Sequence, residues 1–353
     1  MSQPRRPLMR FLALAALALT ACVALIAART PPTVPEVVEA FLKGTGIPGA
    51  VLAHGPANGA PSVVAFGVSD PNTGAQMQVD QAFRLASLTK PITAAALLAR
   101  ADAGKVDLDT PLAQQVAMPM PHDPRAADIT PRHILSHRTG FDRNLSFDPV
   151  FAPEQLGQTR EASCYDLAKT AWAHMPLDHA PGTTKAYSNI GMCLLTGLLG
   201  PDTQDALQGQ ADITIAGLAG PNWRQTGEGW RDIQTSAEEQ RWLTGLGVAG
   251  GGVGRAEALW RFVSEPQPSL SEPQSAGATE DFYALGWRVW PGPDGRQLTH
   301  WGGLPGVFTA MFRFSDDEVV VVLFNAAPPN YAAGFDALYD NLCRARDLRC
   351  GPK

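Results

Sequence analysis

The first pattern after the N-terminal thirty residues is helical, and two apolar runs follow it. Residues 37–42 place apolar side chains at helical spacing, and the pattern stops at Gly44 and Gly46. Short apolar runs follow at 49–53 and 62–66, and the residues between them favour turns. These features predict a short helix and then a hairpin of two strands.

Helical patterns dominate the middle of the chain, from about residue 87 to 265, although long loops interrupt them. The first of them contains the apolar run 94–98. Thr130 followed by Pro131 is typical of a helix N-cap with proline at the first helical position. The stretch 200–235 is rich in Gly, Gln, Asp and Pro, and we predict that it is irregular.

Towards the C-terminus the pattern changes to short apolar runs that are typical of strands. We expect successive antiparallel strands at 283–290, 297–301, 307–314 and 318–324. Phe335, Leu338 and Leu342 then share one face of a closing amphipathic helix. This order predicts an α+β fold in one domain, residues 31–353. Its antiparallel β-sheet is built from N- and C-terminal segments, with flanking helices and an inserted helical region at about 87–265.

The composition is that of a globular protein with a sizeable core. The chain has 353 residues, of which 45% are hydrophobic and 18% are charged. The formal net charge is -6, and no long basic run occurs beyond the first ten residues. A nucleic-acid partner is therefore not expected.

The N-terminus has the order of an export signal, because three arginines precede the apolar stretch 11–28. The pair Arg5 and Arg6 resembles a twin-arginine signal, and Leu19–Cys22 resembles the cleavage box of bacterial lipoproteins. The apolar stretch is also just long enough for an uncleaved membrane anchor. We therefore predict that residues 1–30 lie outside the fold and that the protein is exported to the periplasm or cell envelope. Membrane attachment is expected only through this segment, whether it is cleaved, lipidated at Cys22 or retained.

Beyond this segment the chain has an even number of cysteines: Cys164, Cys193, Cys343 and Cys350. In an oxidising compartment they allow three pairings. We favour a disulfide between Cys343 and Cys350 because they are close in sequence, the alternative being four buried thiols. Their spacing does not match a zinc site, and no metal or cofactor is predicted.

The first candidate for chemistry is Ser87, followed three residues later by Lys90. At the start of a helix this spacing places hydroxyl and amine on one face. Pro91 supports that location, because proline is tolerated only in the first turn of a helix. Serine needs a base before it can attack, and a lysine whose pKa is lowered by burial can serve. A chance match to this short motif is the alternative.

A second candidate is the pair Tyr187 and Asn189, which we expect to project to the same side of an extended segment. The phenol could relay a proton and the amide could bind a substrate or hold the lysine. A turn tyrosine and a capping asparagine are the alternative. Tyr339 and Asn341 have the same spacing but lie in the predicted closing helix, so we interpret them as scaffold.

A third candidate lies at the end of a predicted strand, where His300 and Trp301 precede Gly302 and Gly303. Two glycines let a substrate backbone lie close to the main chain. A histidine here changes its charge near pH 6.5. We therefore expect His300 to make the recognition of a substrate carboxylate depend on pH.

Together these segments resemble the three ordered motifs of the serine β-lactamase and D,D-peptidase superfamily, over roughly residues 45 to 345. The motifs are Phe83 to Lys90, Tyr187-Ser188-Asn189 and His300-Trp301-Gly302-Gly303. Segments 129–137 and 250–252 are also similar to that family.

The resemblance implies a role for each matching residue. Ser87 would be the nucleophile, Lys90 and Tyr187 the shared general base and acid, and Asn189 a substrate binder. His300 would anchor the third motif, in which Trp301, Gly302 and Gly303 would contact the substrate. The N–H groups of Ser87 and Gly303 would form the oxyanion hole.

The sequence departs from the family in two places. β-Lactamases usually carry lysine where His300 stands, and the region after Asn189 looks shortened. D-amino peptidases and esterases of the superfamily accept histidine there. The resemblance thus implies one of those activities, on a small molecule or peptide with an amide or ester bond, and a class C type β-lactamase is the alternative.

Two readings from other classes compete with a serine hydrolase. His133 and His137 lie four apart, as in a metallohydrolase helix, but Ile134 stands where that motif has glutamate. A core or capping role is favoured for both histidines. A catalytically inactive binding or scaffold module would have broken motifs, and those of this chain are intact.

Overall fold

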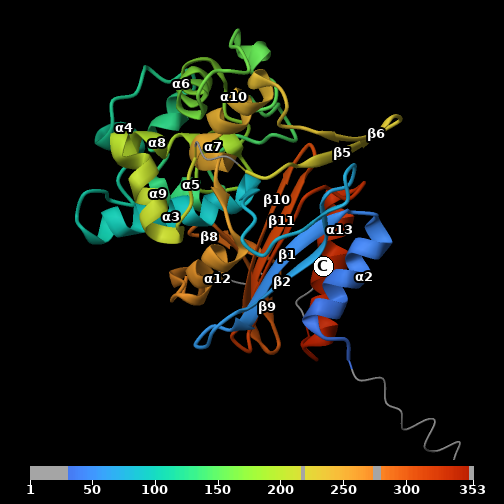
Figure 1. Ribbon diagram of the computed structural model, residues 1–353. Helices are drawn as coiled ribbons and strands as arrows, with labels where there is room; N and C mark the ends of the chain where they lie inside the picture. Colours follow the sequence, from blue (N-terminus) through green and yellow to red (C-terminus); the bar gives the residue numbers. More distant parts are fainter. Residues whose placement is uncertain (1–30, 216–218, 273–279, 350–353) are drawn as a thin grey trace, which may run out of the picture.

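An antiparallel sheet, to which both ends of the chain contribute strands, organises the fold (Figure 1). The structure is a computed structural model that describes residues 31–215, 219–272 and 280–349. In that part of the chain the sheet has eight strands in the order β3-β2-β1-β12-β11-β10-β9-β8. Their bounds are β1 (Gly49–Pro56), β2 (Ser62–Asp70), β3 (Ala75–Gln76), β8 (Phe282–Ala284), β9 (Trp287–Gly292), β10 (Gly295–Leu304), β11 (Val307–Arg313) and β12 (Glu318–Phe324).

The two ends of the chain meet in the middle of this sheet. β1 pairs antiparallel with β12, and Ala50 lies opposite Phe324. β1 also pairs antiparallel with β2, as the predicted hairpin requires. The predicted fold class, an antiparallel sheet assembled from N- and C-terminal segments, is confirmed.

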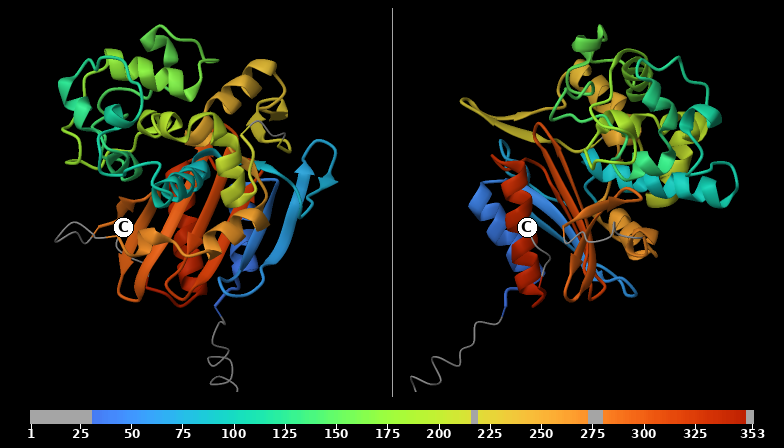
Figure 2. Two further views of the ribbon diagram at one scale, coloured as in Figure 1. Left: turned by 90° about the vertical axis from the view of Figure 1, so that its left-hand side faces the viewer. Right: turned by 180° about the vertical axis from the view of Figure 1, so that it is seen from behind.

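Helices cover both faces of the sheet, which is why every residue of β12 is buried. α2 (Val34–Thr45) and α13 (Tyr331–Ala345) lie side by side on one face (Figures 1 and 2). α12 (Ala256–Ser264) lies on the other face, where Trp260 Nε1 donates to the carbonyl of Val319 at 3.2 Å. α12 thus packs on the sheet although it falls within the predicted helical insert.

Aromatic rings fill the layer between the sheet and α13. Phe312 stacks on Phe335 and Tyr339, with ring centroids 5.6 and 6.1 Å away. The Tyr339 hydroxyl donates to Gln297 Oε1 at 2.7 Å. Tyr339 is therefore a buried part of the scaffold, as predicted.

The inserted region sits at one end of the sheet (Figure 2). Its α-helices are α3 (Thr89–Asp102), α4 (Leu112–Gln115), α5 (Pro131–Leu135), α6 (Cys164–His174), α7 (Asn189–Cys193), α8 (Thr196–Leu199), α9 (Thr203–Ala211), α10 (Ala237–Gly245) and α11 (Gly247–Gly250). Short 3-10 helices are η1 (Ala86–Leu88), η2 (Pro124–Asp128), η3 (Pro153–Leu156), η4 (Gly200–Asp202) and η5 (Pro268–Leu270). Two small strand pairs are β4 (Phe83–Arg84) with β7 (Val253–Gly254), and β5 (Trp223–Thr226) with β6 (Gly229–Asp232).

The prediction that residues 200–235 are irregular is wrong. The segment contains α9 and the hairpin of β5 and β6. The hairpin is anchored to the main sheet, since the backbone N–H of Trp223 donates to the carbonyl of Asn325 at 2.6 Å. Contacts with distant residues, rather than local pattern, stabilise these short strands.

The predicted strand 283–290 is in fact the hairpin of β8 and β9. Leu285 and Gly286 form its turn with positive φ angles of 46° and 86°. A Cβ at Gly286 would lie only 2.6 Å from the Cβ of Ala94, so the turn packs closely against α3. Leucine rarely adopts a positive φ, and for that reason the sequence does not mark the turn.

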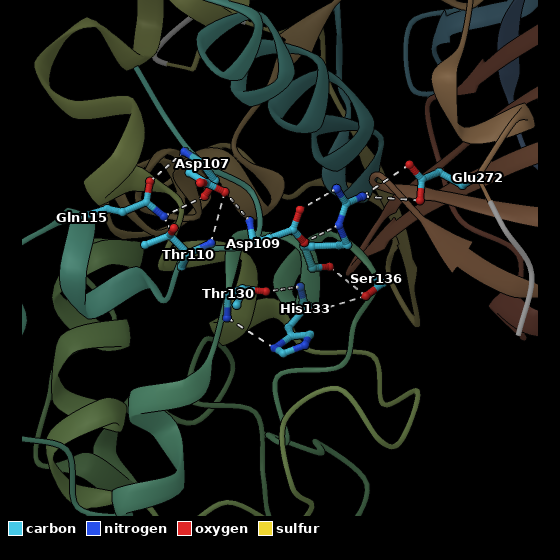
Figure 3. A network of polar contacts seen from close by, with 9 residues as sticks. Asp107, Asp109, Thr110, Gln115, Thr130, His133, Ser136 and Glu272 are labelled. Carbon is cyan, nitrogen blue, oxygen red and sulfur yellow. Dashed lines mark hydrogen bonds and ion pairs between the residues drawn. The ribbon is translucent and has the colours of Figure 1, made fainter. Parts of the chain in front are cut away.

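A network of polar side chains fixes the start of α5 (Figure 3). Thr130 caps the helix, because its Oγ1 accepts from the N–H of His133 at 3.2 Å while its own N–H donates to the His133 ring at 3.3 Å. The neighbouring Arg132 binds both oxygens of Asp109, at 2.7 and 3.0 Å, and also reaches Glu272 at 3.3 Å. The predicted N-cap is confirmed, and the network ties α5 to two distant loops.

Cys164 and Cys193 form a disulfide that links the start of α6 to the end of α7. Cys343 is also disulfide-bonded, whereas Cys350 lies outside the described residues, so the favoured link between them stays a prediction. Residues 1–30 likewise lie outside the described residues. Within the described ranges no helix has the length and apolar character needed to cross a bilayer.

Replacing both Cys164 and Cys193 by alanine is expected to lower the free energy of unfolding by about 3 to 4 kcal/mol, because the cross-link restricts the unfolded chain over a sequence separation of 29. Urea unfolding of the double variant and the wild type, both without reductant, measures the difference. A change below about 1 kcal/mol would show that the link contributes little.

Candidate active site

Ser87 lies where the sheet meets the inserted region, at the junction of η1 and α3. The residue before it, Ala86, has a positive φ of 49°, a conformation that is uncommon for alanine and is found where surrounding structure enforces it. Two hydrogen bonds hold this turn. The N–H of Leu85 donates to the carbonyl of Gly252 at 2.9 Å, and Thr89 Oγ1 donates to the carbonyl of Ala86 at 2.7 Å. Pro91 follows in the first turn of α3, as predicted.

Lys90 is fully buried directly behind Ser87. Its Nζ donates to Ser87 Oγ at 2.9 Å and to the carbonyl of Ala249 at 2.6 Å. Burial lowers the pKa of Lys90 to about 7; the carboxylate of Asp148 opposes this shift, and Arg143 adds to it. A large fraction of Lys90 is therefore neutral near pH 7 and able to accept a proton.

Tyr187 reaches the same serine from the other motif, with its hydroxyl donating to Ser87 Oγ at 2.8 Å. Its ring lies near two cations, since Lys90 Nζ is 5.0 Å and the Arg143 guanidinium carbon 4.6 Å from the ring centroid. Burial, with a smaller contribution from Tyr283, raises the pKa of Tyr187 above its usual range. The phenol thus stays protonated and can donate a proton to a group that lies beside Ser87.

His137 packs against Tyr187. The two ring centroids are 4.3 Å apart, and the N–H of Ser188 donates to His137 Nδ1 at 3.3 Å. Burial, helped by Lys90, lowers the pKa of His137 well below its usual range. Since His133 caps α5 and the described residues hold no cluster of metal ligands, the metallohydrolase alternative has no support.

Asn189 is the first residue of α7, and Ser188 is its N-cap. The prediction of an extended segment through Asn189 is wrong, because the chain turns into the helix there. Asn189 Nδ2 donates to Asp148 Oδ2 at 2.6 Å, and burial raises the pKa of Asp148. Sequence reasoning missed Asp148, which lies in a loop far from the three motifs.

Asp148→Ala is expected to lower kcat/KM by about 10- to 100-fold, because it leaves the Asn189 amide without a charged hydrogen-bond partner. Asp148→Asn should retain much of the activity, since its amide oxygen can still accept. We expect kcat/KM to fall at low pH as Lys90 becomes protonated, and we call this fall the acid limb of the pH profile. In Asp148→Asn the acid limb should lie at lower pH than in wild type, because the Asp148 charge raises the pKa of Lys90. Measuring kcat/KM from pH 5 to 9 tests both, and an unmoved limb in Asp148→Asn would reduce Asp148 to a structural role.

His300 is buried and does not line the pocket beside Ser87. Its Nδ1 lies 3.1 Å from the carbonyl of Trp301, and its Nε2 has no hydrogen-bond partner among the described residues. Burial and the nearby charge of Lys90 lower the pKa of His300 to about 3. The prediction that His300 titrates near pH 6.5 is wrong, and the ring does not line the pocket in which we expected it to meet a substrate carboxylate. The reason is its enclosure, since the ring of Tyr283 packs edge-on at 6.0 Å.

Gly302 allows β10 to lie directly against the turn that carries Ser87. A Cβ at this position would collide with the carbonyl oxygen of Leu85 and with Thr309 Oγ1, and would lie 3.0 Å from the Cβ of Ala86. Only glycine fits without a shift of the backbone. Gly302 is therefore a packing position.

A pocket of about 250 Å³ opens at Ser87. Among the predicted site residues it is lined by Ser87, Tyr187, Asn189, Trp301 and Gly303. Lys90, His300 and Gly302 lie behind its wall. The indole of Trp301 stacks on Tyr331 and Phe335, with ring centroids 6.3 and 6.1 Å away, so the ring itself belongs to the layer next to α13.

The pocket also contains charged residues that the sequence did not single out: Arg143, Lys185, Asp281 and Arg288. They come from loops and from β9, and lack any periodic or motif signal. A search of the segments flanking the Tyr187 motif would have found Lys185 alone.

Comparison with known proteins identifies relatives of this chain. The family model described as Beta-lactamase matches residues 34–342. Probable fimbrial assembly protein FimD, serogroup H1, of Dichelobacter nodosus is 35% identical over 126 residues, covering 34% of this chain and 29% of that protein. Esterase EstB of Burkholderia gladioli is 30% identical over 161 residues, covering 43% and 40%. The D-alanyl-D-alanine-carboxypeptidase/endopeptidase AmpH of Escherichia coli K12 is 30% identical over 136 residues, covering 38% and 34%. The matches thus span well under half of these relatives.

Solved structures share the fold over most of the chain. D-amino acid amidase from Ochrobactrum anthropi SV3 aligns with a TM-score of 0.67 at 18% identity, covering 89% of this chain and 99% of the amidase. EstCE1, a hydrolase with promiscuous acyltransferase activity, aligns with a TM-score of 0.69 at 18% identity, covering 88% and 97%. At these identities the likeness shows the fold alone.

Proposed function

Because the chain belongs to the Beta-lactamase family, we propose that it is a serine hydrolase that cleaves an amide or ester bond through an acyl-enzyme on Ser87. The observation that carries this proposal is the convergence on one hydroxyl. Ser87 Oγ lies 2.9 Å from Lys90 Nζ and 2.8 Å from the Tyr187 hydroxyl, at the floor of a pocket.

In the proposed acylation, neutral Lys90 takes the proton of Ser87 as Oγ attacks the carbonyl carbon of the substrate. The N–H groups of Ser87 and Gly303 would stabilise the oxyanion. As the C–N or C–O bond breaks, Tyr187 donates a proton to the leaving group and recovers one from Lys90. Water then attacks the acyl-enzyme and gives its proton to neutral Lys90, and Ser87 Oγ leaves with a proton from Tyr187, which recovers one from Lys90.

Within this reaction class we favour a D-amino peptidase or an esterase over a class C type β-lactamase. The third motif begins with a histidine that is buried, so it cannot supply the exposed cation that β-lactamases usually have there. The similarity to the esterase EstB and to the carboxypeptidase/endopeptidase AmpH supports an ester or peptide substrate. A catalytically inactive module is not favoured, because Lys90 and Tyr187 both hydrogen-bond to Ser87 Oγ.

The test is covalent labelling with a fluorophosphonate or a fluorescent penicillin, followed by intact mass and peptide mapping. Wild type should gain one adduct on Ser87, and Ser87→Ala should gain none. Wild type that stays unlabelled, or that is labelled elsewhere, would refute the acyl-enzyme proposal. A panel of esters, D-amino amides and β-lactams then ranks the substrates.

We also propose that the protein acts in the periplasm or cell envelope. The disulfide between Cys164 and Cys193 supports an oxidising compartment. Cell fractionation of the natural host with an antibody against residues 31–353 tests this, and recovery in the cytosol would refute it.

A further inference from the structure

The wall of the pocket carries an excess of positive charge. Its ionised lining residues are the cations Arg143, Lys185 and Arg288, and the anion Asp281. Asp281 is already paired, since its Oδ2 accepts from Arg288 Nε at 2.7 Å and from Lys185 Nζ at 3.1 Å. One carboxylate therefore pairs with two cations. The third cation has no ion-pair partner among the described residues, and it interacts with the carboxylate of Asp148 only from beyond ion-pair distance.

That third cation is Arg143. It is exposed at the pocket, and within residues 31–215, 219–272 and 280–349 it forms neither an ion pair nor a hydrogen bond. Its guanidinium carbon lies 4.6 Å from the centroid of the Tyr187 ring. The hydroxyl of Tyr187 in turn donates to Ser87 Oγ, so the Arg143 guanidinium and the nucleophile both contact Tyr187.

This charge distribution discriminates between substrates. A free ammonium group would meet Arg143 and find Asp281 already neutralised. The other nearby carboxylate, Asp148, is engaged by Asn189 and does not line the pocket. A substrate carboxylate would instead meet the planar guanidinium of Arg143, whose N–H donors are exposed and have no acceptor among the described residues. Such a planar group can bind a carboxylate through two parallel hydrogen bonds.

We propose that Arg143 selects substrates with a carboxylate beside the scissile bond. The inference rests on the proposed function and narrows it to anionic esters and amides. Of the activities proposed above, it favours an esterase or a peptidase of carboxylate-bearing substrates over a peptidase whose substrates carry a free α-ammonium. Arg143 then performs, from the Tyr187 side of the pocket, the recognition that the enclosed His300 cannot perform.

The experiment compares two substrates that differ in one group: an N-acyl depsipeptide whose leaving group is a 2-hydroxy acid, and the same compound with that carboxylate converted to carboxamide. In wild type, kcat/KM should favour the carboxylate by about 10- to 100-fold, the range for a charge-assisted hydrogen bond. Arg143→Gln should bring the ratio close to one, and Arg143→Lys should keep part of it. Taking the ratio cancels any change in the pKa of Lys90, because both substrates use the same base.

Arg160→Gln is the matched control. Arg160 is also exposed and also lies 4.6 Å over an aromatic ring, that of Trp242, but it does not line this pocket. It should leave the ratio unchanged. A wild-type ratio near one, or a ratio that survives in Arg143→Gln, would overturn the inference.

Failure of the proposed function would look different, because neither substrate would be hydrolysed. In that case calorimetric binding of the same pair to Ser87→Ala decides the inference. Tighter binding of the carboxylate that disappears with Arg143→Gln supports it, and equal binding of the two compounds overturns it.

Discussion

Ser87→Ala is expected to lower kcat/KM by on the order of 10⁴-fold or more while the fold stays intact. Lys90 and Tyr187 both hydrogen-bond to the serine Oγ. Its loss removes the nucleophile, so the base and the acid no longer have a reacting group between them. Lys90 keeps its hydrogen bond to the carbonyl of Ala249, and the substitution removes one oxygen from a partly open position. The measurement is steady-state hydrolysis of the best ester or amide in the panel, together with thermal unfolding.

Ser136→Ala serves as the control for this experiment. Ser136 also lies in the inserted region, and its hydroxyl donates to the carbonyl of Arg132 at 2.8 Å, away from the pocket. It should keep wild-type kcat/KM. Wild-type activity in a folded Ser87→Ala protein would remove Ser87 from the mechanism.

Lys90→Met is expected to be nearly as damaging, with a loss on the order of 10³-fold, because methionine fills the same buried space but cannot accept a proton. In wild type, kcat/KM should rise with pH up to a plateau and fall about tenfold per unit below a pKa of about 7, where Lys90 becomes charged. Rates of wild type and Lys90→Met from pH 5 to 9 measure both effects.

The same pKa shift gives a stability test with a definite sign. The folded pKa of Lys90 lies below its ordinary value of 10.5, so the unfolded chain binds the extra proton between about pH 10.5 and 7. Wild type should therefore lose stability relative to Lys90→Met as the pH falls through that window. A pH profile without an acid limb near 7, or active Lys90→Met protein, would assign the base to another group.

Arg143→Gln provides an internal control on this assignment. The charge of Arg143 lowers the pKa of Lys90, so its removal should move the acid limb to higher pH, opposite to the shift expected for Asp148→Asn. Opposite shifts from two neighbours of opposite charge would identify Lys90 as the titrating base.

Much of this architecture follows from local sequence. β1 and β2 are short apolar runs separated by turn residues, and Pro91 restricts Ser87 to a helix start. The spacing from Ser87 to Lys90 is set by one turn of helix, so neighbouring residues alone determine that contact. For such features the physical cause lies within a few residues of the feature itself.

The features that could not be predicted depend on distant parts of the chain. His300 opens the third motif in the sequence, but its surroundings come from distant elements: the ring of Tyr283, from β8, packs against it, and the charge of Lys90, from α3, helps to lower its pKa. Asp148 and Arg143 enter the site from a loop whose path is set by the packing of the inserted helices. Their sequence neighbourhood gives no sign of that destination.

The pairing of β1 with β12 has a consequence for how the molecule is made. Ala50 leaves the ribosome long before Phe324, its partner across the sheet. Until β12 has been synthesised, β1 has one open edge, and open edges pair readily with other chains. Contacts between such distant residues also form slowly. Because Gly302 of β10 must seat against the turn at Ser87, we expect the reactive pocket to appear only after the whole sheet has closed, so that hydrolysis itself reports complete folding.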